Sequence, residues 1–129
     1  MKLHASALAI GLLAFAAFPA WSADAMMPAS IKVADGMLTG SNGMTLYTFD
    51  KDTAGSGKSV CNDACATNWP PLMVKEGEMA SGDYSIVTRD DGKKQWAAKG
   101  KPLYFWIKDQ KPGDKTGDGV NNVWHIAKP

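Results

Sequence analysis

Short apolar runs alternate with clusters of Gly, Pro, Asp and Asn along most of the chain, a pattern typical of strands joined by turns. Two of these runs, "SIKVA" at 30–34 and "YSIVT" at 84–88, precede the pairs Asp35-Gly36 and Asp91-Gly92. An Asp-Gly pair between apolar runs predicts a β-hairpin, because a type I′ turn needs positive φ at both central residues. We therefore expect an all-β protein with a hairpin at each of these places.

An unusual heptad occurs twice, as "LYTFDKD" at 46–52 and as "LYFWIKD" at 103–109. Both copies have the form Leu-Tyr-x-aromatic-x-x-Asp, and their tyrosines, Tyr47 and Tyr104, stand 57 positions apart. In a strand, residues two apart point to the same face, so each Tyr and the aromatic residue after it form a pair. The Asp that ends each heptad stands where a carboxylate commonly accepts N–H groups of a turn.

The surroundings of the two heptads also match. Each Tyr lies four residues after a Gly, and Trp69 or Trp124 follows it after 22 or 20 residues. Repeats of this length usually form units that cannot bury their apolar face alone. The sequence predicts two similar antiparallel β repeats, 30–72 and 84–127, packed with approximate twofold symmetry. The motif residues are candidates for the core or, if exposed, for a binding surface: Tyr47, Phe49, Asp52, Trp69, Tyr104, Trp106, Asp109 and Trp124.

The ends of the two repeats differ. The first ends in "CNDACATNWPPL", where Ala64 to Thr67 are expected to form one short helical turn near the cysteine pair. Pro70-Pro71 would stop that turn, because proline lacks the backbone N–H and clashes with the preceding turn. The second ends in "NNVWHIA", which is expected to be a final strand.

The N-terminus has the pattern of a secretory signal peptide. Lys2 and His4 precede an apolar run, Ala5 to Phe18, and small residues follow it. We expect a signal peptide at 1–23, cleaved within 22–25, and one β domain at 24–129. No second apolar stretch long enough to span a membrane follows, and no Cys after the run offers a lipid attachment point. The expected product is soluble and periplasmic or secreted.

The charge balance of the processed chain is close to zero. Removal of Lys2 with the leader leaves 13 basic residues against 13 acidic ones. Binding to nucleic acid or to an anionic membrane depends on an excess of positive charge, so neither is an expected partner.

The motif and its surroundings resemble a bacterial family of secreted repeats of unknown function, often described as predicted lipoproteins with a Tyr-x-(Phe/Trp/Tyr)-x-x-Asp motif. The matching stretches include both heptads, "CNDACATNWPPL" and "GKPLYFWIKDQKPGDKTGDGVNNVWHI". The resemblance extends from Ile31 nearly to the end of the chain. It implies a location in the envelope or outside the cell, and it implies no activity.

Cys61 and Cys65 are the two cysteines of the chain. Export favours oxidation, and each sulfur has only the other to pair with, so we expect a local disulfide. A thiol-redox role and metal ligation are the alternatives.

Candidate metal ligands are few. His125 is the one histidine that remains after processing. The stretch from Asp114 to Gly119 begins like a calcium loop, with Asp118 at the fifth position. Thr116 at the third position and His125 at the twelfth depart from that pattern. His125, Asp114 and Asp118 are therefore the remaining metal candidates, and we expect no cofactor.

No catalytic motif was found. The chain contains no Gly-x-Ser-x-Gly and no phosphate-binding glycine loop before a helix. The sequence favours an exported, non-catalytic envelope protein that binds an unknown partner or small ligand. The alternatives are a periplasmic metal-binding or thiol-redox accessory protein and an undescribed hydrolase that uses Asp residues at strand ends.

Overall fold

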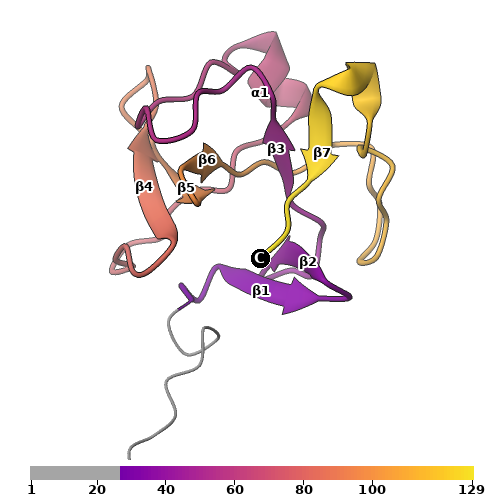
Figure 1. Cartoon of the computed structure of the whole chain (residues 1–129), viewed down its shortest axis with the longest axis horizontal. Helices are drawn as coiled ribbons and strands as arrows, with labels where there is room; N and C mark the ends of the chain where they lie inside the picture. The colour runs from indigo at the N-terminus through magenta and orange to yellow at the C-terminus, as the bar shows by residue number, and fades with distance from the viewer. Residues whose placement is uncertain (1–26) are drawn as a thin grey trace, which may run out of the picture.

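The computed structural model describes residues 27–129, and its regular elements are mainly short antiparallel strands (Figure 1). The predicted signal peptide, 1–23, and its cleavage point lie outside the described residues. In chain order the elements are β1 (Ile31–Ala34), β2 (Met37–Gly40), β3 (Tyr47–Phe49), α1 (Ala64–Asn68), β4 (Tyr84–Thr88), β5 (Lys94–Ala98), β6 (Lys101–Pro102), η2 (Val120–Asn122) and β7 (Trp124–Ile126). The all-β prediction is confirmed, as are the short helix near the cysteines and the final strand.

The strands form three small antiparallel sheets, β1–β2, β3–β7 and β4–β5–β6. In the sheet of β3 and β7, a strand of the first repeat pairs with the last strand of the second, and the two lie side by side in Figure 1. Isolated bridges join Tyr47 to Tyr104 and Pro71 to Tyr104, which connects the sheets across the middle of the molecule.

Both predicted hairpins form, with different turns. Asp35 and Gly36 have φ of 52° and 77°, as a type I′ turn requires. The second turn is longer: the N–H of Arg89 donates to Lys93 O at 2.8 Å, and the N–H of Gly92 donates to Arg89 O at 2.8 Å. Of the Asp-Gly pair in this turn, only Gly92 has positive φ, 84°. The type I′ expectation is therefore wrong at the second hairpin, because three residues and not two close it.

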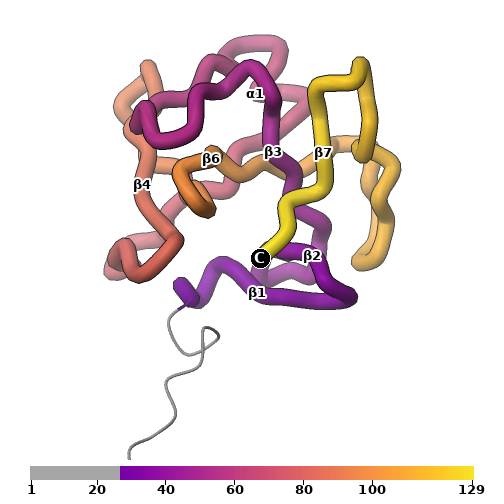
Figure 2. The backbone as a smooth tube through the Cα atoms, in the orientation of Figure 1, coloured from indigo at the N-terminus to yellow at the C-terminus, as the bar shows by residue number. Residues whose placement is uncertain are grey.

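Matching hydrogen bonds show the approximate twofold relation. Tyr47 and Tyr104 exchange backbone N–H···O bonds of 2.8 and 3.0 Å, so the symmetry axis passes between them. The N–H of Leu38 donates to Ala127 O at 2.9 Å, and the N–H of Trp96 donates to Leu72 O at 2.8 Å. The hairpin of each repeat therefore binds the last segment of the other repeat. Figure 2 shows one of these contacts, with the C-terminus beside the β1–β2 hairpin.

The core has two parts. One is mainly aliphatic, with Trp96 as its one buried aromatic residue; its buried members are Ile31, Leu38, Leu46, Leu72, Trp96, Ala98, Leu103 and Ala127. The other is aromatic, with buried members Tyr47, Cys61, Trp69, Tyr104 and Trp124. Because the exchanged segments supply residues to both parts, neither repeat has a complete core of its own.

Candidate functional site

The two heptads are joined by a reciprocal pair of hydrogen bonds. Tyr47 Oη donates to Asp109 Oδ2 at 2.6 Å, and Tyr104 Oη donates to Asp52 Oδ2 at 2.5 Å. The Tyr of each repeat therefore binds the Asp of the other. The second oxygen of each carboxylate closes its own loop, as predicted for an Asp at a strand end: Asp52 Oδ1 accepts the N–H of Val60 at 2.7 Å, and Asp109 Oδ1 accepts that of Thr116 at 3.0 Å.

Burial governs the protonation of these groups. Burial raises the pKa of both Tyr47 and Tyr104 far above the usual value, and the hydrogen bond to a carboxylate raises each pKa further. Burial also raises the pKa of Asp52, although the hydrogen bonds from Tyr104 and Val60 oppose this rise. Both phenols therefore stay protonated at neutral pH and act as hydrogen-bond donors.

The aromatic residues of the two repeats form one continuous stack. Trp69 and Trp124 stack on each other at the symmetry axis, with ring centroids 3.7 Å apart. Trp106 covers the outer face of Trp69 at 3.9 Å, and Phe49 covers Trp124 at 4.2 Å. Tyr47 packs edge-on against Trp69, and Tyr104 packs edge-on against Trp124. All eight motif residues thus meet in one interior cluster, although Phe49 and Trp106 at its ends are partly exposed.

A buried arginine supports the loop of the first repeat. Arg89 is 5% exposed, and its guanidinium donates to Gln95 Oε1 at 2.7 Å, to Cys61 O at 2.6 Å and to Ser59 Oγ at 3.1 Å. Ser59 Oγ also bonds Tyr104 Oη at 2.6 Å, so the cation is linked to the phenol that Asp52 holds. Sequence reasoning missed Arg89, because an Arg beside Asp90 and Asp91 has the pattern of an exposed turn.

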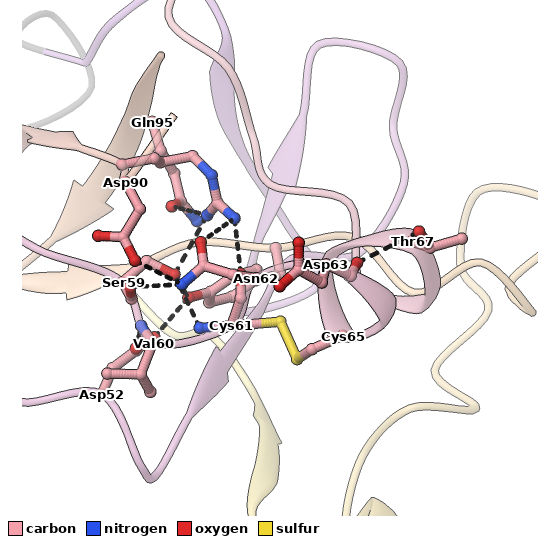
Figure 3. Close-up of a disulfide and its surroundings, with 12 residues drawn as sticks. Asp52, Ser59, Val60, Cys61, Asn62, Asp63, Cys65, Thr67, Asp90 and Gln95 are labelled. Carbon is pink, nitrogen blue, oxygen red and sulfur yellow. Dashed lines mark hydrogen bonds between the residues drawn. A yellow bond between two sulfur atoms is a disulfide. The ribbon is translucent and has the colours of Figure 1, made fainter. Parts of the chain in front are cut away.

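The predicted disulfide is confirmed. Cys61 and Cys65 are bonded, and the bond connects the loop that ends at the buried Cys61 to helix α1 (Figure 3). Asn62, between them, donates from Nδ2 to Asp90 Oδ2 at 3.2 Å, which also links this loop to the second hairpin. The second repeat has no cysteine at the matching place. There Gly117 packs so closely that a Cβ would lie 2.9 Å from the ring of Tyr47.

The metal candidates are each engaged in a different way. Asp114 Oδ2 accepts the N–H groups of Gln110 and Lys111 at 2.8 and 3.2 Å, and these bonds lower the pKa of Asp114. Asp118 Oδ1 accepts the N–H of Ile126 at 3.2 Å, and His125 Nε2 contacts Asp50 Oδ2 at 2.8 Å. Within residues 27–129, no group of three or more His, Cys, Asp or Glu side chains could hold a metal ion.

Two surface clefts are lined in part by residues that adjoin motif residues in the sequence. The first, the polar cleft, has a volume of about 340 Å³, and its polar lining side chains are Thr48, Asp50, Lys99, Lys101, His125 and Lys128. The second, called the apolar cleft, has a volume of about 510 Å³, and it contains one lysine; its lining is Ser30, Ser41, Asn42, Pro70, Pro71, Leu72, Met73, Lys75 and Phe105.

The two clefts occupy equivalent places in the two repeats. Thr48 and Phe105 each follow the motif Tyr, and His125 and Pro70 each follow the stacked Trp. In the same way, Lys128 matches Met73, four residues after the Trp, and Lys99 matches Asn42, just before the turn Gly. Equivalent backbone positions in the two repeats thus carry different lining side chains in the two clefts. No single residue predicted the clefts from the sequence, but an alignment of the repeats on their Tyr and Trp shows the divergence.

The fold and the reciprocal Tyr–Asp hydrogen bonds define the class of protein: an antiparallel β domain built from two intertwined copies of one unit. The chain belongs to the family described as a secreted repeat of unknown function, whose model matches residues 29–73 and 85–128. The two matched segments correspond closely to the two repeats seen in the structure. No curated protein and no solved structure matches the chain. Among the described residues, no helix is long and apolar enough to cross a membrane.

Proposed function

We propose that the chain is exported as a single domain, 24–129, and acts as a non-catalytic binding module of the cell envelope. In this module the motif builds the scaffold, and the clefts receive the ligand or partner. The contacts of the motif residues support this division. Each motif Asp and each motif Tyr Oη has a hydrogen-bond partner inside the protein, and the aromatic rings stack on one another.

The observation that carries the proposal is the divergence of the two equivalent clefts. In both repeats the last segment forms the same backbone hydrogen bonds with the hairpin of the other repeat. The buried residues of both repeats must therefore preserve the same pairing. The exposed lining is free of that requirement, and it differs: His125 and Lys128 stand where the other cleft has Pro70 and Met73. Concave sites with a few convergent polar groups are the usual form of ligand sites.

The protonation states support a non-catalytic role. The raised pKa values of Tyr47 and Tyr104 make poor nucleophiles of the phenols, and the disulfide leaves Cys61 and Cys65 without a thiolate.

The undescribed hydrolase remains the second candidate, and one contact favours it. Asp50 bonds the imidazole of His125, and a carboxylate that orients an imidazole is a general-base arrangement. Thr48, the cross-strand neighbour of His125, brings a hydroxyl to the same cleft. Hydrolysis of ester or phosphoester substrates that is lost in His125→Gln would favour this candidate over the binding module.

The binding module is tested by NMR of the exported protein with a panel of small anions, sugars, aromatic compounds and peptides. We expect backbone amide shifts concentrated around one cleft, and loss of those shifts when that cleft is altered by Lys128→Ser or Met73→Ser. Lys115→Ser, an exposed change outside both clefts, is the control. Shifts that cluster away from both clefts, or no shifts with any compound, would contradict the proposal.

A further inference from the structure

The polar cleft gathers basic side chains from two separate parts of the chain. Lys99 lies in the turn between β5 and β6 and Lys101 begins β6, while His125 lies in β7 and Lys128 follows that strand. The β5–β6 turn belongs to the sheet of the second hairpin, and β7 belongs to the sheet with β3. Convergence of like charges from different sheets is unfavourable unless an anion or water screens them.

The lysines of the polar cleft lack acidic partners. Among the described residues the one ion pair within 4.0 Å is that of His125 with Asp50, at 2.8 Å. Asp50 is the one acidic side chain of the lining, and it pairs with His125 and not with a lysine. Three lysines therefore line the cleft without a carboxylate on their ammonium groups.

The lining also contains an apolar wall. Ala98 and Ala127 are 7% and 3% exposed, and the partly buried Ile126, the last residue of β7, precedes Ala127 in the same lining. An apolar wall lowers the local dielectric and strengthens the attraction between the ammonium groups and an anion in the cleft. The volume, about 340 Å³, suits a ligand of the size of phosphate or a small polycarboxylate.

The fold does not require these charges, and the apolar cleft is the internal comparison that shows it. At the equivalent positions Lys99 is replaced by Asn42 and Lys128 by Met73 on the same backbone frame. We infer that the polar cleft binds a small anion with two or more charged oxygens, such as a phosphate or a polycarboxylate. This inference rests on the proposed function and names the ligand class of one of its two clefts.

The test measures binding of inorganic phosphate and of citrate by calorimetry and amide shifts, at constant low ionic strength, with chloride as the monovalent control. The cleft variant is Lys99→Asn with Lys128→Met, which installs the residues of the apolar cleft. The control variant is Lys58→Asn with Lys115→Met, which removes the same charge by the same substitutions at exposed sites outside the cleft. Unchanged denaturant midpoints confirm that both variants are folded.

We expect saturable binding of phosphate or citrate that the cleft variant weakens by about tenfold or more, while the control variant weakens it less than about twofold. Binding of phosphate alone assigns a phosphoryl ligand, and binding of citrate alone assigns a carboxylate ligand. Equal weakening in both variants, or no saturable binding of either anion up to about 10 mM, overturns the inference. If other compounds still shift residues of either cleft in that case, the binding module stands and only its anionic ligand is excluded.

Discussion

The loops after the two heptads hold equivalent tyrosines by different means. The first loop closes over Tyr104 with Asp52 and Ser59, and a disulfide and a buried arginine fix its position. The second closes over Tyr47 with Asp109 and the backbone of Gly117, whose N–H donates to Tyr47 Oη at 3.2 Å. The Tyr–Asp contact is common to both, and the supports around it are not.

This difference separates what the twofold fold requires from what each repeat adds. The reciprocal contacts join one repeat to the other, so a change at either contact affects both. Arg89 and the Cys61–Cys65 bond act on one loop only, as do Thr116 and Gly117 on the other. The clefts follow the same rule, because their buried frame is shared and their exposed lining has diverged.

The largest expected effect comes from the shared part. Tyr47→Ala and Tyr104→Ala should each lower the free energy of unfolding by about 3–5 kcal/mol, because each removes a fully buried aromatic ring. The two losses should be similar, since each Tyr packs edge-on against a stacked Trp and binds an Asp of the other repeat. Urea denaturation measures both. Unchanged midpoints in both variants would mean that the motif serves binding and not the core.

Arg89→Met should cost less and should affect the first loop alone. It leaves buried acceptors such as Gln95 Oε1 and Cys61 O without their donor, at a cost of about 1–3 kcal/mol each. The total loss should be about 2–3 kcal/mol, since the methionine recovers part of the packing. Lys93→Met, an exposed change in the same hairpin, is the matched control and should be nearly neutral. Hydrogen exchange should rise around Ser59 and Cys61 and not around Thr116.

Local chemistry predicted much of this fold. The hairpins, the helical turn before Pro70-Pro71 and the strand at Trp124 depend on residues close together in the sequence, and all are confirmed. The repeated heptad also predicted the twofold relation. The partners of the tyrosines were not predictable, because Tyr47 and Tyr104 bind residues 62 and 52 positions away in the other repeat. A pattern in one heptad does not indicate whether its Asp serves its own Tyr or the other one.

The disulfide should contribute about 2 kcal/mol, as expected for closing so short a ring in the unfolded chain. Reduction, or Cys65→Ala, should lower the stability by this amount and loosen the first loop. The second loop, which has no disulfide, provides the comparison within the same molecule. Denaturation with and without reductant measures the effect. A protein whose midpoint is insensitive to reductant would show that Arg89 and helix α1 hold the loop without the bond.

The smallest expected effect is a difference in pH dependence between two carboxyl groups, Asp52 and Glu78. Burial raises the pKa of Asp52 above its ordinary value, so the folded state favours its protonated form. Its contribution to stability is therefore complete below the ordinary pKa, about 4, and is lost as the pH rises through the raised pKa. The side chain in the Asp52→Asn variant is uncharged at every pH. The stability of the wild type relative to Asp52→Asn should therefore fall as the pH rises above about 4.

Glu78 is the control of opposite sign. Burial tends to raise its pKa, but hydrogen bonds from Lys75, Ser30 and Trp96 outweigh burial and lower the pKa. Glu78 therefore stabilises the fold above its ordinary pKa, and this contribution is lost as the pH falls through the lowered value. The stability of the wild type relative to Glu78→Gln should rise with pH up to the ordinary Glu pKa, about 4.3, and stay level above it, where that relative to Asp52→Asn falls. Urea midpoints of the three proteins from about pH 3 to 7 decide the matter. If both stability differences changed with pH in the same direction, the hydrogen bonds from Tyr104 and Val60 would outweigh the effect of burial on the pKa of Asp52. The carboxylate of Asp52 would then be charged in the folded protein.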